Sequence, residues 1–363
     1  MFSKKENGAV KGIGDNDNLK PRRSARLLTS LVSNDPTENL QIKNGAAKAP
    51  RIGLALRRHN PLVDEKNIPE KLRLADKPAP LISTKPYSFH DLRFGGGSTL
   101  VSVDFAEDID QYLRYLEKVR QIEPDFLNGK NIDGRMRQIL VDWMIQVQQR
   151  FQLCSETLQL SVATLDRVLG ELSVSKDNLQ LLGVTCMFIA AKFEEIYVPN
   201  IQDFVYIAAN IFTKKDVLRM EGKVLHSVGF QLCTPYTIQF LRKYRAFMNN
   251  DSSLHNLAKL ITEVALLDYS LAHILPSKVA ATSLYLAGRM LQMELPAHMF
   301  EVMKVSENEI VELAKKFVHP IRQWTSKSAK LQTILKSYEK LCATSKATIL
   351  PIEAFGDLLS DES

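Results

Sequence analysis

One nearly unbroken apolar segment limits the folds open to this chain. Between Ile139 and Val147 only two polar residues interrupt the hydrophobic side chains, so a helix here is apolar around most of its circumference. Such a helix must be enclosed by other helices. Asp133, just upstream, is a residue type that caps helix N-termini. The segment 135–153 therefore predicts the central helix of an all-helical domain.

Four apolar residues near the start of this helix fall at positions i, i+3, i+4 and i+7. They are Met136, Ile139, Leu140 and Trp143, and at helical spacing they form one stripe. A stripe of this kind belongs to the core or lines a groove at the surface. The spacing alone leaves both interpretations open.

The chain from about residue 133 onward is predicted to be helix after helix, with no alternating pattern typical of strands. Thr213 and Ser306 each open a fifth helix with a capping signal, and their 93-residue spacing indicates an internal repeat of two five-helix units. A last helix is expected over 327–342. The expected segments are 135–153, 157–172, 175–195, 200–210 and 213–228, then 236–248, 254–269, 277–293, 297–303 and 306–324.

The first 98 residues differ from the rest. They contain 18 Lys and Arg against 10 Asp and Glu, which leaves 29 against 31 for the remainder. With eight prolines and little apolar periodicity, this tail is predicted to be disordered, because it cannot bury enough surface to offset its ordering entropy. One amphipathic helix, detached from the others, is expected between Asp104 and Pro124. Because the folding part is near neutral, no nucleic-acid partner is expected.

Other classes of function lack their sequence signals. The four cysteines lie far apart with no Cys-x-x-Cys or Cys/His cluster, so no metal site and no disulfide framework is expected. No apolar run approaches eighteen residues and the N-terminus has no secretion signal, which favours an intracellular chain without a membrane partner. No catalytic arrangement or phosphate loop is visible, so we expect neither an enzyme nor a cofactor.

Five motifs occur in order at the spacing of a known family. They are Met136-Arg-Gln-Ile-Leu140 with Val-Asp-Trp143, Thr-Leu-Asp166-Arg167, Ala191-Lys-Phe-Glu-Glu-Ile196, Asp203-Phe-Val-Tyr206 and Val217-Leu-Arg-Met-Glu221. Over about residues 100–345 the chain resembles the mitotic B-type cyclins. The resemblance implies an all-α fold of two tandem five-helix cyclin boxes, preceded by a detached helix and a disordered tail. The corresponding division is 1–98 for the basic tail with degradation signals, 99–130 for the helix and linker, 131–235 and 236–345 for the boxes, and 346–363 for the C-terminal tail.

The resemblance implies a non-catalytic subunit that binds and activates a mitotic cyclin-dependent kinase at the G2/M transition, in nucleus and cytoplasm according to the cell cycle. A rigid surface can switch a kinase by holding its αC helix in place. The implied kinase-binding residues are Ile109, Tyr112, Lys192, Phe193, Glu194, Glu195, Ile196 and Glu221. A solvated helix end for Glu194 and Glu195, and a core position for Phe193, remain open. A DNA-binding initiation factor with two cyclin-like repeats is the alternative, but it would need a basic folded body and usually a zinc ribbon.

The resemblance to the B-type cyclins also implies a role for the apolar stripe. In similar cyclins it docks Arg-x-Leu peptides of substrates and inhibitors, and the implied patch here is Met136, Ile139, Leu140, Trp143, Gln146, Leu179 and Gln180. Gln146 stands where some cyclins have glutamate, so docking is expected to be weaker by about 1 kcal/mol. Arg137 is expected to be structural and paired with Asp166.

Two degradation signals are implied in the tail. Lys5, Glu6 and Asn7 match a KEN box, and Arg51 with Leu54 forms a candidate destruction box whose asparagine, Asn60, comes one place later than usual. The resemblance therefore implies recognition by the anaphase-promoting ubiquitin ligase at mitotic exit.

Overall fold

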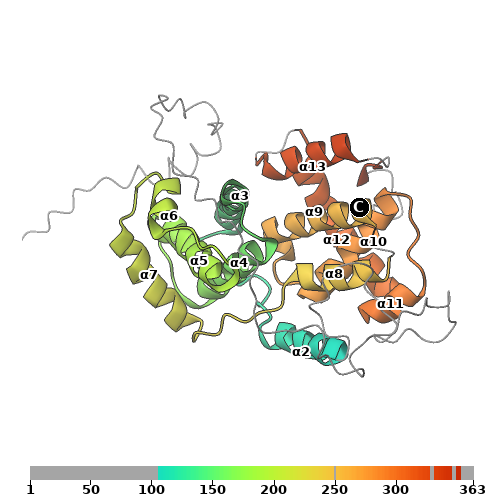
Figure 1. Cartoon of the computed structure of the whole chain (residues 1–363), viewed down its shortest axis with the longest axis horizontal. Coiled ribbons are helices and arrows are strands. Elements are labelled where there is room, and N and C mark those ends of the chain that lie inside the picture. Colours follow the sequence, from blue (N-terminus) through green and yellow to red (C-terminus); the bar gives the residue numbers. More distant parts are fainter. Residues whose placement is uncertain (1–104, 249–250, 328–330, 346–348, 353–363) are drawn as a thin grey trace, which may run out of the picture.

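The computed structural model describes residues 105–248, 251–327, 331–345 and 349–352. Within these ranges every regular element is a helix and no strand occurs, so the predicted all-α class is confirmed. The helices form two groups that lie side by side (Figure 1). The first group is the α3–α7 domain, and the second is the α8–α12 domain with α13 packed on it.

All ten helices predicted between residues 135 and 324 are present, with ends displaced by at most four residues. The first domain contains α3 Gly134–Phe151, α4 Ser155–Glu171, α5 Leu179–Glu194, α6 Ile201–Ile207 and α7 Lys214–Ser227. The second contains α8 Thr237–Ala246, α9 Ser252–Leu267, α10 Pro276–Met290, α11 His298–Met303 and α12 Glu307–Thr325. Two further helices flank them, α2 Ala106–Val119 and α13 Thr333–Thr344.

The helix starts follow local capping chemistry. The Asp133 carboxylate accepts a hydrogen bond from the Met136 backbone N–H at 2.8 Å at the start of α3. Thr213 begins α7 with a reciprocal capping box to Asp216, and the Ser306 hydroxyl caps α12. These side chains satisfy backbone N–H groups that have no partner within the helix, so they determine where these three helices begin.

The most enclosed helix of the first domain is α5, not α3 as predicted. Every residue of α5 from Leu179 to Ala191 is buried, whereas α3 keeps one side at the surface. The helix contacts α3, α4, α6 and α7. Its equivalent in the second domain is α10, and the paired alanines Ala190-Ala191 and Ala280-Ala281 are fully buried in both. Small side chains let the neighbouring backbones approach closely.

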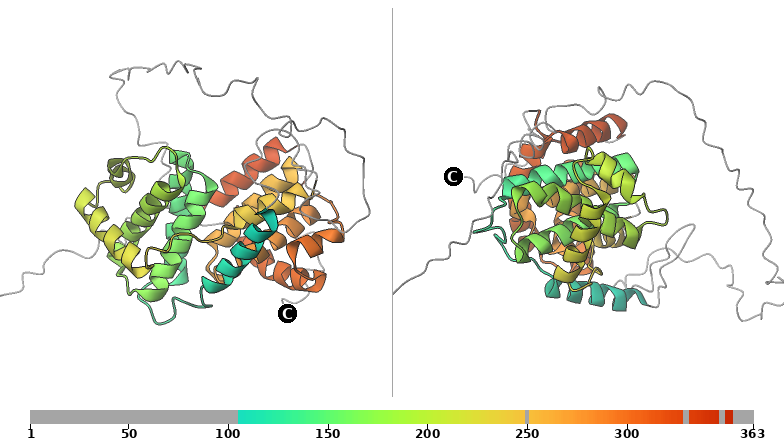
Figure 2. Two further views of the ribbon diagram at one scale, coloured as in Figure 1. Left: turned by 60° about the horizontal axis from the view of Figure 1, so that its bottom comes forward. Right: turned by 90° about the vertical axis from the view of Figure 1, so that its left-hand side faces the viewer.

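Helix α2 packs on the second domain, across which it lies in Figure 2. The face it buries carries two carboxylates, Asp110 and Glu117, whereas most of the apolar face expected from its periodicity is exposed. Asp110 binds Lys243 Nζ at 2.7 Å and Lys304 Nζ at 3.0 Å. Burial alone would raise the pKa of Asp110, but these ammonium groups lower it overall.

The other buried carboxylate of α2 holds the start of α10. Glu117 accepts hydrogen bonds from the Ser277 backbone N–H at 2.9 Å and the Ser277 hydroxyl at 2.7 Å. Burial raises the pKa of this carboxyl, although the bonds from Ser277 oppose the shift. A negative group at a helix N-terminus is electrostatically favourable. The helix is therefore attached by polar contacts as well as by Leu116, which is buried.

Candidate functional site

Large apolar side chains are exposed where α5 ends. Phe193 is half exposed, and Ile196 and Tyr197 are 90% and 91% exposed. Val198 and Tyr206 of the following segment and α6 are also exposed. Contiguous apolar surface of this kind on a folded domain marks a site of interaction with another protein. We call these five residues the α5 surface.

Lys192 and Glu221, both predicted as kinase anchors, meet beside the α5 surface. Lys192 Nζ forms an ion pair with Glu221 Oε1, which joins α5 to α7. The same ammonium lies 4.4 Å from the centre of the Phe188 ring, a cation–π contact. The lysine side chain is 42% exposed and the glutamate 12%. A partner that docks on the α5 surface can therefore reach this pair.

Glu194 and Glu195 are bonded within the chain, so they are not a solvated helix end. Glu195 Oε1 accepts hydrogen bonds from the Cys154 backbone N–H at 2.8 Å and the Thr157 hydroxyl at 2.6 Å. Glu194 Oε1 accepts a hydrogen bond from the Tyr236 hydroxyl, and burial together with this carboxylate raises the pKa of Tyr236. The two glutamates tie the end of α5 to α4 and to the segment between the domains.

A second exposed apolar stripe runs along α2. It includes Ile109 and Tyr112, the two residues of this helix that were predicted to contact a kinase, and each is about half exposed. Phe105, Tyr115 and Val119 extend it. The prediction did not include Tyr115 or Tyr197, although both directly continue apolar patterns that it used. We call these five residues the α2 stripe.

The predicted Arg-x-Leu patch is mostly closed. Leu140, Trp143, Leu179 and Gln180 are buried, with Leu140 and Leu179 fully inaccessible. Met136 and Ile139 are half-buried and remain at the surface. The core interpretation therefore holds for the inner part of the stripe, and only its outer edge is open to a peptide. The reason is that α3 packs on α5 along this face.

The polar end of that patch contacts α13. Gln146 Nε2 donates to Asp142 Oδ2 at 2.8 Å and to the Thr333 hydroxyl at 3.0 Å. Asp142 is buried, which raises its pKa, while hydrogen bonds from Thr333 and Gln146 oppose that shift. The sequence did not predict this contact, because Thr333 lies 187 residues away from Gln146 along the chain. The N-terminus of α13 thus occupies the polar end of the patch.

Arg137 and Asp166 form the predicted ion pair. Arg137 Nε and one terminal nitrogen lie 2.6 and 2.7 Å from the two carboxylate oxygens, a bidentate arrangement. The other terminal nitrogen donates to the backbone carbonyls of Leu266 and Leu267 at 3.2 Å each. Arg137 is 1% exposed. One side chain of the first domain therefore also caps the C-terminus of α9 in the second.

The remaining predictions concern the degradation signals, metal binding and membrane spans. The KEN box and candidate destruction box fall outside the described residues. In the part of the chain that the structure describes, no group of three or more His, Cys, Asp or Glu residues could hold a metal ion. No helix in this part is both long and apolar enough to cross a membrane.

The fold and the exposed apolar surfaces define a helical binding protein with two tandem domains. Residues 108–233 match the cyclin N-terminal domain, and residues 235–350 match the cyclin C-terminal domain. Together the two matches cover two thirds of the chain, and they show that it belongs to the cyclin family. Members of this family are regulatory subunits and not catalysts.

Relatives identify the branch of the family. The chain is 38% identical over 260 residues to G2/mitotic-specific cyclin-B2 of Macaca fascicularis, an alignment that covers 71% of this chain and 65% of the relative. It is 46% identical over 184 residues to cyclin-B2 of Anguilla japonica, covering 51% of this chain and 47% of the relative. These alignments show that the chain is a B-type mitotic cyclin. The aligned part spans less than two thirds of the length of either relative.

A solved structure supports the fold. The viral cyclin from herpesvirus saimiri superposes with a TM-score of 0.51 at 17% sequence identity. The match covers 65% of this chain and 97% of the viral protein. It therefore extends over both helical domains and concerns the arrangement of the helices alone.

Proposed function

We propose that the chain binds and activates a mitotic cyclin-dependent kinase and thereby promotes the G2/M transition. The observation that carries this proposal is the α5 surface beside the Lys192–Glu221 pair. A bound cyclin changes kinase activity only if it binds the active arrangement more tightly than the inactive one. Moving that equilibrium from about 1:99 to 99:1 requires about 5.5 kcal/mol of differential binding, which calls for an extended apolar surface.

The α2 stripe enlarges the proposed interface. The C-terminal end of α2 adjoins the segment between the domains, because Arg120 donates to the Gln231 carbonyl oxygen at 2.8 Å. The end of α5 adjoins the same segment through the Tyr236–Glu194 bond. Both apolar surfaces therefore flank residues 231–236 and are proposed to contact one kinase molecule together.

The direct test is complex formation with a purified, inactive cyclin-dependent kinase. We expect the two proteins to co-elute in gel filtration and the kinase to phosphorylate a histone substrate only when the chain is present. Phosphorylation by the chain alone would refute a regulatory role. Failure to co-elute with the mitotic kinase, while a different cyclin-dependent kinase does co-elute, would refute the proposed partner.

Arg-x-Leu peptides are proposed to dock at the open edge formed by Met136, Ile139 and Gln146. Thr333 competes for the polar end of that edge, so Thr333→Val should release Gln146 from its bond to the threonine hydroxyl while nearly preserving side-chain volume. We expect an Arg-x-Leu peptide to bind about fivefold more tightly, the equivalent of about one neutral hydrogen bond. Fluorescence anisotropy with a labelled peptide measures this, and Thr344→Val on the exposed end of α13 is the control. Unchanged or weaker binding would show that α13 does not compete.

Timed destruction by the anaphase-promoting ubiquitin ligase is also proposed, through Lys5-Glu6-Asn7 and Arg51 with Leu54. Replacing these five residues by alanine should stabilise the protein at mitotic exit nearly as well as deleting residues 1–98, although every lysine outside the KEN box remains. A degradation time course in mitotic extract compares the full chain, the shortened chain and the alanine variant. If the alanine variant disappears as fast as the full chain, the two motifs are not the signal.

Cell-cycle-dependent residence in nucleus and cytoplasm completes the proposal. It rests on the family assignment and on the regulatory role proposed above. Live imaging of a fluorescent fusion through one division tests it, and a fluorescence ratio between the two compartments that never changes would contradict it.

A further inference from the structure

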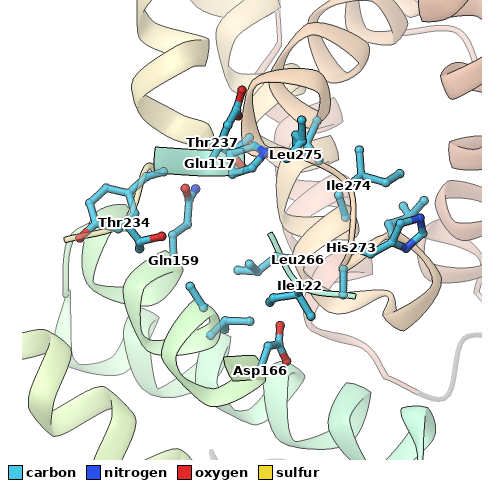
Figure 3. A pocket seen from close by; sticks show the side chains of 18 of the residues that line it. Glu117, Ile122, Gln159, Asp166, Thr234, Thr237, Leu266, His273, Ile274 and Leu275 are labelled. Carbon is cyan, nitrogen blue, oxygen red and sulfur yellow. The ribbon is translucent and has the colours of Figure 1, made fainter. Parts of the chain in front are cut away.

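A cavity of about 110 Å³ lies between the two domains (Figure 3). Gln159 and Asp166 of α4 line one side of it, and Leu266 and Ile274 line the opposite side. The loop after α2 and the segment joining the domains complete the wall. No residue assigned above to contact a kinase or an Arg-x-Leu peptide lines this space, which shares only residues 234–236 with the segment that the two proposed kinase-binding surfaces flank.

The inner wall of the cavity is mainly apolar. Ile122, Val162 and Ala163 come from the first half of the described chain, and Leu266, Ile274 and Val279 come from the second domain. An apolar protein cavity of about 150 Å³ is large enough for benzene. A cavity of about 110 Å³ therefore has room for one branched aliphatic group the size of a leucine side chain.

The two carboxylates in the wall are already engaged. Asp166 is held by Arg137 in the bidentate pair, and Glu117 is held by Ser277. Neither is available to neutralise a further positive charge. Any cation that borders the cavity must find its counter-charge elsewhere.

Arg120 is such a cation. It lines the cavity, its Nε is buried without a hydrogen-bond partner, and it forms no ion pair within the described residues. Arg167 donates to the same Gln231 carbonyl oxygen at 2.7 Å. Burial and the adjacent charge of Arg120 lower the pKa of Arg167, and Glu171 offsets only part of this effect. Two guanidinium groups thus converge on one neutral oxygen.

The position of Arg167 beside Arg120 is explained in part by capping of the C-terminus of α7. Arg167 also donates to the Val228 carbonyl at 3.2 Å, and cations are favourable near a helix C-terminus. That role needs only the terminal nitrogens of the two arginines. It leaves the buried Nε of Arg120, at the edge of an apolar cavity, without a hydrogen-bond partner from the described part of the protein.

We propose that the cavity is a docking site for a short linear peptide in which an aliphatic residue adjoins acidic ones. The aliphatic side chain fills the cavity, and a carboxylate accepts hydrogen bonds from Arg120, with Arg167 adding positive charge. Charge complementarity selects this occupant, because a basic peptide would bring further positive charge to two guanidinium groups that form no ion pair within the described residues. Tyr236 also lines the cavity, so the bound peptide lies next to the residue that holds Glu194.

The test uses the full chain labelled at its isoleucine, leucine and valine methyl groups, titrated with acetyl-Leu-Asp-Glu-amide and followed by NMR. We expect saturable shifts at the methyl groups of Ile122, Val162, Leu266 and Ile274. Replacing the leucine by alanine, or both acidic residues by their amides, should weaken binding at least tenfold. If all three peptides bind alike, or if these methyl groups do not respond, the proposal is wrong.

Two variants test whether the positive charge of Arg120 binds the peptide. Arg120→Gln should weaken the acidic peptide at least tenfold and leave the amide version unchanged. Lys118→Gln is the control, because Lys118 is an exposed cation on the same turn of α2 that does not line the cavity. Equal affinity of Arg120→Gln and wild type for the acidic peptide would overturn the assignment. The peptide comparison on the wild-type chain remains decisive if the Arg120 variant does not fold.

Discussion

Replacing Arg137 with alanine is expected to lower the free energy of unfolding by roughly 3–5 kcal/mol, because it leaves a buried carboxylate without its partner. Asp166 would lose both of its bonds to the guanidinium. The carbonyls of Leu266 and Leu267 would lose their donor at the same time. The variant therefore weakens the core of the first domain and its junction with the second.

Thermal unfolding followed by circular dichroism measures this effect. For a body of about 240 residues, a loss of this size corresponds to a decrease in Tm of about 10 °C. Arg135→Ala is the matched control, because Arg135 is an exposed arginine two residues earlier on α3, and it should change the Tm little. A Tm for Arg137→Ala equal to that of wild type would show that the buried pair contributes no net stability.

Replacing both Lys192 and Glu221 with alanine should abolish kinase activation and leave the fold intact. Residues that dominate a protein interface typically contribute about 2 kcal/mol or more each, so the double variant should bind the kinase about 1,000-fold more weakly. Solvent screens this ion pair at its lysine end, because Lys192 is 42% exposed, so the pair contributes little to stability although Glu221 is only 12% exposed. The Tm and helical content should therefore stay close to those of wild type.

A charge-swapped chain separates the two roles of this pair. Lys192→Glu combined with Glu221→Lys keeps an ion pair between α5 and α7 but reverses the charges presented to a partner. It should fail to activate the kinase, whereas Lys223→Ala, an exposed lysine on α7, should activate normally. Normal activation by the swapped chain, or unfolding of the double alanine variant, would assign the pair a structural role alone.

The helices were predictable because their signals are local. Apolar residues at helical spacing fixed their faces, and Asp133, Thr213 and Ser306 fixed where three of them begin. The partner of Arg137 came from a family resemblance, since nothing in the local pattern connects it with Asp166, 29 residues away. Capping and periodicity are properties of neighbouring residues, and ion pairs between helices are not.

The burial of the α2 carboxylates could not be predicted for the same reason. A pattern analysis places Asp110 and Glu117 in water, because a buried charge is unfavourable unless it is paired. Their partners Lys243, Lys304 and Ser277 come from more than 130 residues away. Once those partners are present, the polar face of the helix packs inward and most of the apolar face is left for another protein.

The burial of the apolar stripe on α3 could not be predicted from the sequence either. Spacing placed Met136, Ile139, Leu140 and Trp143 on one stripe, and it could not tell a groove from a core. Whether each residue is buried depends on how closely it lies to α5. That helix covers Leu140 and Trp143 and leaves Met136 and Ile139 at the surface. The contact between Gln146 and Thr333 depends on where the last helix returns to the first domain.

Arg137 belongs to the first five-helix unit and donates hydrogen bonds to the second, so the two units cannot be separated without losing these bonds. The two five-helix units look like copies of one module, yet neither is complete when separated from the other. The first unit alone would hold a guanidinium with one nitrogen facing solvent, and the second would end α9 on two uncapped carbonyls. Each half therefore relies on the other for these hydrogen bonds, and replacing one half by its counterpart would keep them only if that counterpart also carried an arginine at this junction.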